Sequence, residues 1–272
     1  MDVTFCFLVT RDLIKESTWR SWLSRLQDLG LKFNVITHCS LAYKENIRSE
    51  WLKYTIIPDE YLRDTFWAWL TKATLSMYKY ALENSKSSWY SIHSESCVPF
   101  VSPERFIENF QQFKHNSFLN HCKAWWTPTY SSNDRANLHL LPKEYHLAHA
   151  QWCILCLEDM VDIINLTESD KQLTDIITSG HTADESILAI FLFKINNFKN
   201  VINKLTTITD WKRSPTGCNP YTFNSWTEAD KIAVHELCED KTKNEYMFMR
   251  KIGKEFPDNL LERFTQNNQS FL

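Results

Sequence analysis

Hydrophobic and polar positions follow two kinds of pattern along the first part of the chain. Short runs of apolar, β-branched and aromatic residues predict buried strands. Between them, apolar residues recur at helical spacing and predict amphipathic helices. A strand, a helix and a strand in succession predict a parallel pair joined by a right-handed crossover. Strands are expected at 3–10, 32–39, 53–57 and 89–93, and helices at 12–29 and 65–84.

The second part of the chain has less regular patterns. Ser102 and Pro103 form a typical helix N-terminus, with a serine cap followed by proline. Thr182 and Glu185 have the spacing of a capping box. We expect loops and irregular structure at 115–147 and 194–226. Residues 151–157 are expected to form a strand, and residues 245–252 a strand or the end of a helix. Helices are expected at 158–165, 182–193, 229–239 and after Pro257.

The alternation of strands and helices predicts a mixed α/β fold. Neither a repeat nor a clear linker divides the sequence, so we expect one domain over residues 1–272. The part up to residue 115 has the alternation of a Rossmann-like nucleotide-binding sheet. We therefore expect residues 1–115 to bind a nucleotide.

Composition narrows the classes of function. The 272 residues are 43% hydrophobic and 14% aromatic, and the net charge is −3, which is typical of a folded globular protein and gives no basic field for nucleic acid. The apolar runs are too short to span a membrane. The sequence has eight cysteines and begins with an acidic second residue and a strand-like run rather than a signal peptide, so we expect reduced thiols in a soluble, cytoplasmic protein.

The stretch WYSIHSESCVPF, residues 89–100, ends an aromatic strand in a group of polar residues. Ser94 and Ser96 lack the glycines of a serine-hydrolase elbow. Cys97 is followed by Val and Pro, which favours packing over nucleophilic attack. Cys153 and Cys156 have C-x-x-C spacing inside an apolar strand, where core thiols are the simpler interpretation.

Two charged groups each admit two interpretations. Glu185 either complements a helix N-terminus or serves as a catalytic carboxylate. Arg250, Lys251 and Lys254 form either a solvated surface or a basic group that neutralises a diphosphate. An Asp-x-Asp metal motif follows none of the predicted strands, so we expect a reaction without a metal or other cofactor.

Seven segments taken in order carry a resemblance to one family. They are TFCFLVTRD, FNVITHC, SESCVPF, HNSFL with RANLHLLPKEYHLAHAQWCIL, HTADESILAIFL, TDWKRSPTGCNPYTF and EYMFMRKIGKEFP. Together they resemble the core-2/I-branching-type glycosyltransferases, above all the plant-type members. The branching β-1,6-N-acetylglucosaminyltransferases and the peptide xylosyltransferases are similar at greater distance.

The resemblance implies a GT-A-like glycosyltransferase fold and an inverting, metal-independent transfer from a UDP-sugar to a glycan or glycoprotein. It implies that residues 1–115 bind the nucleotide-sugar and that residues 116–272 bind the acceptor and carry out catalysis. In this family the position of Glu185 is the general base, and those of Arg250 and Lys251, with Lys254 as an alternate, lie near the diphosphate. If the glutamate is a base, its carboxylate faces the cleft and does not close the capping box. The remaining matched positions are Thr10, Arg11 and His38 near the nucleotide, and Ser94, Glu95, Trp152, Asp184 and Trp211 near the sugars.

Some positions depart from the family pattern. Ala183 replaces the usual Pro before the Asp-Glu pair, and Ala148-His149 replaces Lys-Gly. Cys97 follows the plant-type members, where the animal enzymes have Asp. The donor is expected to be UDP-xylose or UDP-GlcNAc, with xylose slightly favoured. The family's membrane anchor and stem are not matched, so we expect either a trimmed catalytic domain or a naturally soluble, cytoplasmic or virus-encoded enzyme, with the second favoured. The alternative is a non-catalytic nucleotide- or glycan-binding module on the same fold.

Overall fold

A computed structural model describes residues 1–126, 135–239, 242 and 244–266. Its largest sheet is mixed, with the strand order β2-β1-β3-β8-β5-β9. The first three strands of this order, β2 (Phe33–Cys39), β1 (Val3–Val9) and β3 (Trp89–Ser94), run parallel. All seven residues of β1 are buried, as expected for a strand covered on both faces. The predicted parallel pair is therefore confirmed.

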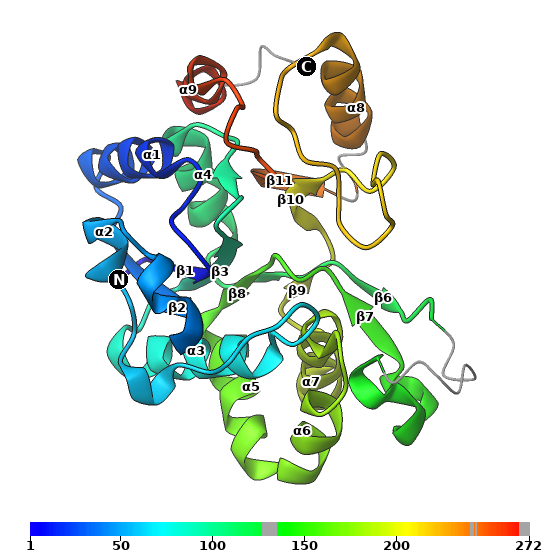
Figure 1. The fold of residues 1–272 in the computed structure, drawn as a ribbon. Coiled ribbons are helices and arrows are strands. Elements are labelled where there is room, and N and C mark those ends of the chain that lie inside the picture. The colour runs from blue at the N-terminus through cyan, green and yellow to red at the C-terminus, as the bar shows by residue number, and fades with distance from the viewer. Residues whose placement is uncertain (127–134, 240–241, 243, 267–272) are drawn as a thin grey trace.

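Helices cover both faces of this sheet (Figure 1). The helices α1 (Glu16–Asp28) and α4 (Pro103–Phe113) contact each other on one face. On the other face, α3 (Thr71–Asn84) packs against α5 (Leu157–Ser169). The Oγ of Ser102 accepts a hydrogen bond from the backbone N–H of Arg105 (3.2 Å), which confirms the predicted cap of α4.

The remaining strands complete the main sheet and form two smaller ones. In the main sheet, β8 (Ile154–Cys156) is antiparallel to β3 and to β5 (Ser117–Phe118), and β9 (Val201–Ile202) is parallel to β5. The strands β6 (His121–Lys123) and β7 (Leu147–His149) form an antiparallel pair. The third sheet has the order β10 (Leu205–Thr209), β11 (Asn244–Arg250), β4 (Val98–Pro99).

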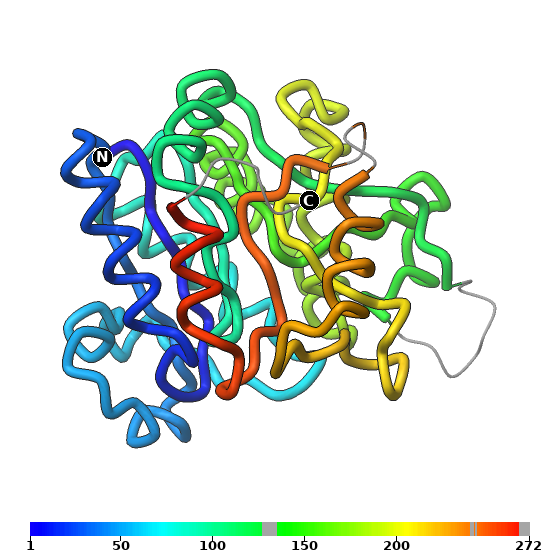
Figure 2. The backbone as a smooth tube through the Cα atoms, turned by 90° about the horizontal axis from the view of Figure 1, so that it is seen from above, coloured from blue at the N-terminus to red at the C-terminus, as the bar shows by residue number. Residues whose placement is uncertain are grey.

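The other helices lie around these sheets. Below the main sheet in Figure 1 are α6 (Lys171–Thr178) and α7 (Ile187–Asn196), and beside the third sheet is α8 (Glu228–Glu239). Viewed from above, α9 (Asp258–Gln266) lies beside α1, which it also contacts (Figure 2). The chain thus closes its C-terminal segment against the first helix.

An aromatic core joins the main sheet to the third sheet. Phe248 of β11 lies 4.3 Å from the ring of His93 and 5.8 Å from that of Trp19, centroid to centroid. Phe106 of α4 and Trp22 of α1 contact the same ring. Much of the high aromatic content therefore serves packing, and it fixes β11 and its last residue, Arg250, relative to the parallel strands.

Several predicted elements differ from the structure. The expected strand at 53–57 is wrong, because α2 (Glu50–Lys53) precedes a single parallel bridge between Thr37 and Ile56. The helix expected at 65–84 begins at Thr71, and the one expected at 182–193 is a 3₁₀ turn (Ala183–Glu185) followed by α7. Two regions expected to be irregular contain short strands: β5 and β6 lie within 115–147, and β9 and β10 lie within 194–226. The helix α6 was not predicted.

The structure describes one mixed α/β chain. Its eight cysteines are free thiols. Within the described residues, no helix is both long and apolar enough to cross a membrane. The functional division at residue 115 stays a prediction.

Candidate active site

The turn at the carboxyl end of β3 joins three parts of the chain. The N–H of Cys97 donates to the carbonyl of Ser94 (3.1 Å), which closes the turn. The hydroxyl of Ser94 lies 3.1 Å from that of Ser96, and the carbonyl of Ser96 accepts from the N–H of Ile252 (2.9 Å). The carbonyl of Glu95 accepts from the N–H of Ile14 (2.9 Å). The turn therefore ties the end of β3 to the segments after β1 and β11.

The carboxylate of Glu95 lies between the ends of two neighbouring parallel strands. The hydroxyl of Thr10, just after β1, donates to its Oε1 (3.4 Å), and the Nε of Arg11 lies 3.7 Å from the same atom. The strand order places β2 and β3 on opposite sides of β1. Ligands of open α/β sheets bind where the strand order reverses in this way, at the carboxyl ends of the strands.

Arg250, the last residue of β11, faces the same place. Its guanidinium carbon lies 4.4 Å from the ring centroid of Trp152. Desolvation lowers its pKa, and interactions with Cys97, Glu95 and Glu185 oppose that shift. Its Nε is buried and has no hydrogen-bond partner among the described residues. A desolvated guanidinium with an unused N–H is suited to bind an anion.

Lys251 adds a second positive charge beside Arg250. Its Nζ donates to the side-chain oxygen of Asn219 (2.7 Å), and burial, followed by repulsion from Arg250, lowers its pKa. Lys254 differs, because this residue is exposed and its backbone carbonyl accepts from Lys15 (2.9 Å). Of the three predicted basic residues, the first two therefore converge.

Glu185 lies in the 3₁₀ turn Ala183–Glu185. Thr182 has a left-handed backbone (φ 54°) and makes no side-chain capping bond, so the capping box is not formed, as we expected for a base. The carboxylate instead pairs with Arg135, with 2.6 Å between Oε2 and Nη2. Burial raises the pKa of Glu185, while the charges of Arg135 and Arg250 oppose that rise.

Asp184 is more deeply buried than its neighbour. The residue is 7% exposed, and burial raises its pKa, while its own backbone and that of Leu70 oppose the rise. Its Oδ1 is buried without a hydrogen-bond partner in the part of the chain that the structure describes. Asp184 is therefore a buried acid directly beside Glu185 in the same 3₁₀ turn.

Sequence reasoning assigned no role to Arg135. Besides pairing with Glu185, its guanidinium carbon lies 3.8 Å from the ring centroid of Trp126. The arginine precedes its partner by fifty residues in sequence, so no helical or strand spacing connects them. Its position in the matched segment RANLHLLPKEYHLAHAQWCIL was the only available signal.

His38 lies within the core at the carboxyl end of β2. The residue is fully buried, and its Nε2 accepts from the N–H of Arg63 (3.0 Å). Burial lowers its pKa to about 4, so the ring is neutral at pH 7. The imidazole ring therefore holds the backbone of Arg63 in place.

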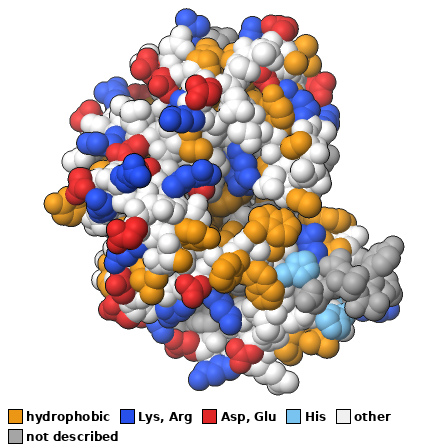
Figure 3. Space-filling view, in the orientation of Figure 1, with side chains coloured by type: hydrophobic (Ala, Val, Ile, Leu, Met, Phe, Trp, Pro, Cys, Tyr) orange, Lys and Arg blue, Asp and Glu red, His pale blue; other side chains and the backbone are white. Residues whose placement is uncertain are grey.

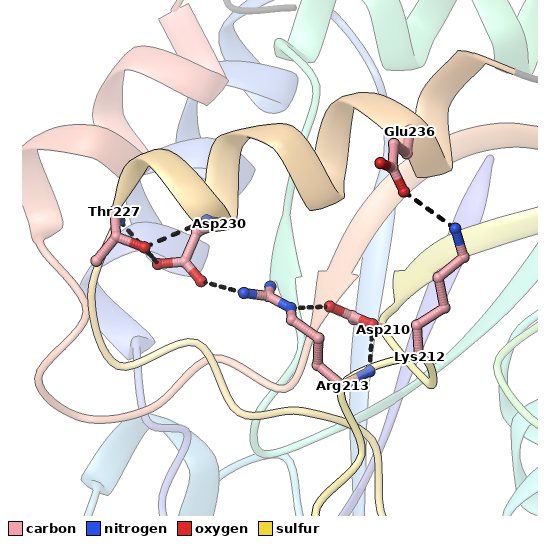
Figure 4. Close-up of polar contacts among 6 residues, drawn as sticks. All are labelled: Asp210, Lys212, Arg213, Thr227, Asp230 and Glu236. Carbon is pink, nitrogen blue, oxygen red and sulfur yellow. Dashed lines mark hydrogen bonds and ion pairs between the residues drawn. The ribbon is translucent and has the colours of Figure 1, made fainter.

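Trp211 is half exposed and lies on a loop that ion pairs hold in place. Arg213 bonds both Asp210 and Asp230, with 2.9 Å between its Nη1 and Asp230 Oδ1 (Figure 4). Asp230 also accepts from the hydroxyl of Thr227 (2.7 Å). The loop is therefore fixed against the start of α8.

Cys97 lacks the surroundings of a nucleophile. It is fully buried, its Sγ accepts from the N–H of Ser94 (3.3 Å), and burial raises its pKa. A reactive cysteine needs a lowered pKa. His93, the nearest histidine in sequence, is enclosed by aromatic rings, and burial lowers its pKa to about 3.

The structure thus brings together most of the predicted site. Contacts and charges connect residues from five parts of the chain: Thr10, Arg11, Ser94, Glu95, Trp152, Asp184, Glu185, Arg250 and Lys251. The face of the molecule seen in Figure 3 is hollowed near its middle, with basic side chains above the recess and hydrophobic ones below it.

Among the residues that the structure describes, no group of three or more His, Cys, Asp or Glu side chains could hold a metal ion. No protein-family model matches this chain, and a search of curated proteins finds no match.

Proposed function

We propose that this protein is an inverting, metal-independent glycosyltransferase with a GT-A-like fold. It transfers xylose or N-acetylglucosamine from a UDP-sugar to a hydroxyl group of a glycan and forms a β-linkage. The observation that carries the proposal is the guanidinium of Arg250, whose buried Nε has no hydrogen-bond partner among the described residues and on which the charge of Glu185 acts.

The architecture around β1 supports a nucleotide ligand. The order β2-β1-β3, with helices on both faces, is that of one common class of doubly wound sheet, in which nucleotides bind beside the first strand. Thr10, Arg11 and Glu95 lie at this point. A uridine diphosphate bound there reaches Arg250 and Lys251 with its phosphates.

The two kinds of charge suit the two halves of the reaction. Glu185 accepts the proton of the acceptor hydroxyl while that oxygen forms a bond to the anomeric carbon. The bond from this carbon to the β-phosphate oxygen breaks on the opposite face, and its electron pair leaves with UDP. Arg250 and Lys251 stabilise the charge that develops on the phosphate.

The raised pKa of Glu185 suits a general base. Burial raises its pKa and makes the carboxylate a better proton acceptor, and the pairing with Arg135 favours the ionised form. The net shift is upward, so the carboxylate is more basic than that of an exposed glutamate.

The Glu185→Gln substitution tests this role. It keeps the shape of the side chain and removes the base, so transfer should fall by about 10²–10⁴-fold. UDP affinity, measured by calorimetry, should stay close to that of the wild-type protein. Equal turnover in wild type and variant would remove Glu185 from the mechanism.

A chelator tests the metal-free mechanism separately. Turnover should be unchanged in EDTA, because Arg250 and Lys251 supply the positive charge that a metal gives in other transferases. Loss of activity in EDTA and its recovery on addition of Mn²⁺ would contradict this part of the proposal.

A further inference from the structure

The loop just before α3 exposes three aromatic side chains in four residues. Phe66 is 66% exposed, Trp67 69% and Trp69 43%. The N–H of Trp69 donates to the carbonyl of Phe66 (2.9 Å), and Ala68 between them has a left-handed backbone (φ 67°). The loop is thus a tight turn that presents its rings to solvent. Burying these rings would be favourable, so their exposure is a cost that suggests a ligand.

These rings line a concave pocket with polar groups. The pocket has a volume of about 600 Å³, within the range of small-molecule sites. Its lining combines aromatic rings with a carboxylate, an ammonium group and two hydroxyls: Asp64, Phe66, Trp67, Trp69, Thr71, Lys72 and Thr178. Flat apolar faces beside hydrogen-bonding groups suit a ligand that has an apolar face and polar edges, as a pyranose ring has.

The aromatic loop is attached to the turn that carries Glu185. The carbonyl of Ala68 accepts from the N–H of Thr182 (2.6 Å). The backbone of the next residue but one, Leu70, lies close enough to the carboxylate of Asp184 to lower its pKa. A ligand in the pocket therefore lies against the loop that holds the proposed base in place.

We propose that this pocket is a carbohydrate subsite, in which a pyranose ring of the acceptor glycan stacks on Trp67 or Trp69 and the polar lining bonds its hydroxyls. Calling this sugar the acceptor depends on the function proposed above, whereas sugar binding itself does not. The net charge of −3 makes a nucleic acid a poor alternative. The uracil ring of UDP is the other flat ligand, and the experiment separates it from a sugar.

Calorimetric titration tests the subsite without turnover, using two neutral tetrasaccharides, cellotetraose and chitotetraose. The wild-type protein should bind at least one of them at millimolar concentration. Both Trp67→Ala and Trp69→Ala should weaken that binding, at least one of them by tenfold or more, since an aromatic stacking platform typically contributes this much. The Trp67→Phe variant, which keeps a ring, should lose less than Trp67→Ala.

Tyr54→Ala is the matched control, because Tyr54 is 88% exposed and lies outside the pocket lining. It should bind the tetrasaccharides as the wild type does. UDP affinity should be unchanged in all four variants.

Unaltered sugar binding in both Trp→Ala variants, or no binding by the wild type, overturns the subsite. Loss of UDP affinity in them would assign the pocket to the donor instead. Because no step requires transfer, an inactive but sugar-binding protein would contradict the proposed function alone.

Discussion

Burial, more than sequence position, determines what the ionisable residues of the site can do. Burial removes water from both Glu185 and Arg250. The pKa of the Glu185 carboxyl group therefore rises, and that of the Arg250 guanidinium falls. Each group also acts on the other through its charge. In the sequence they are separated by 65 positions, and only the resemblance to a glycosyltransferase family placed them in one site.

The pH dependence of catalysis should report the raised pKa of Glu185. A base acts only when ionised, so kcat/KM should fall as the pH drops through this pKa, at a higher pH than for an exposed glutamate. In Arg135→Met the loss of the positive charge should raise the pKa further and move the acid limb upward. Arg135→Lys, which keeps the charge, should move it less. An acid limb at the same pH in all three proteins would contradict this account.

Cys97→Ala tests whether the thiol in the turn after β3 takes part in the chemistry. The thiol is buried and its pKa is raised, so it is expected to pack and not to react. The variant should keep kcat within a few-fold of wild type, with a modest loss in thermal stability. A loss of activity comparable to that of Glu185→Gln would make Cys97 a participant in the chemistry.

Among the elements, the loops that carry functional side chains were the least predictable. The pattern HTADES predicted that α7 begins at Thr182, whereas the chain forms a 3₁₀ turn that points Glu185 toward Arg135. The backbone of Thr182 bonds Ala68, which is over one hundred residues away. Such tertiary contacts override local capping preference, and they cannot be read from a local pattern.

The loop that carries Trp211 contains two basic residues, Lys212 and Arg213, whose ion pairs are drawn in Figure 4. Substituting each of them gives a matched pair of variants. Arg213 joins Asp210 and Asp230, which are each 1% exposed, whereas Lys212 pairs with Glu236 at the surface. Arg213→Met leaves two buried carboxylates without this partner and should cost about 3 kcal/mol in the free energy of unfolding. Lys212→Met should cost below about 1 kcal/mol. Denaturant titration measures both, and equal losses would show that the loop is not held by Arg213.

At the scale of the whole molecule, hydrophobic periodicity predicted the parallel strands and the helices that cover them. The buried strands β1 and β3 and the capped helix α4 have patterns that local chemistry explains. The short strands β9 and β10 were missed, since two to five residues give little periodicity and their pairing is with distant strands. The position of Arg250 depends on the third sheet, because Arg250 is the last residue of β11.

Three buried histidines should make stability depend on pH. Burial lowers the pKa of His38 and His149 to about 4 and that of His93 to about 3, below the value of about 6.5 in the unfolded chain. The unfolded state therefore binds more protons below pH 6.5, and stability present above that pH is lost as the pH falls toward 4. Each histidine should contribute a loss of about 2 kcal/mol between pH 7 and 5. Urea unfolding at pH 7, 6 and 5 measures this, and a constant free energy of unfolding would contradict it.

The central claim is that this protein cleaves a UDP-sugar without a metal. The most direct measurement is UDP release from a panel of UDP-sugars, incubated with the protein in EDTA and without an acceptor, with Glu185→Gln and Arg250→Met beside the wild type. We expect the wild type to release UDP from UDP-xylose or UDP-GlcNAc. Arg250→Met should lose this activity because the leaving phosphate loses its positive charge, and Glu185→Gln should still bind UDP. A wild-type protein that neither binds UDP nor releases it from any member of the panel would contradict the account.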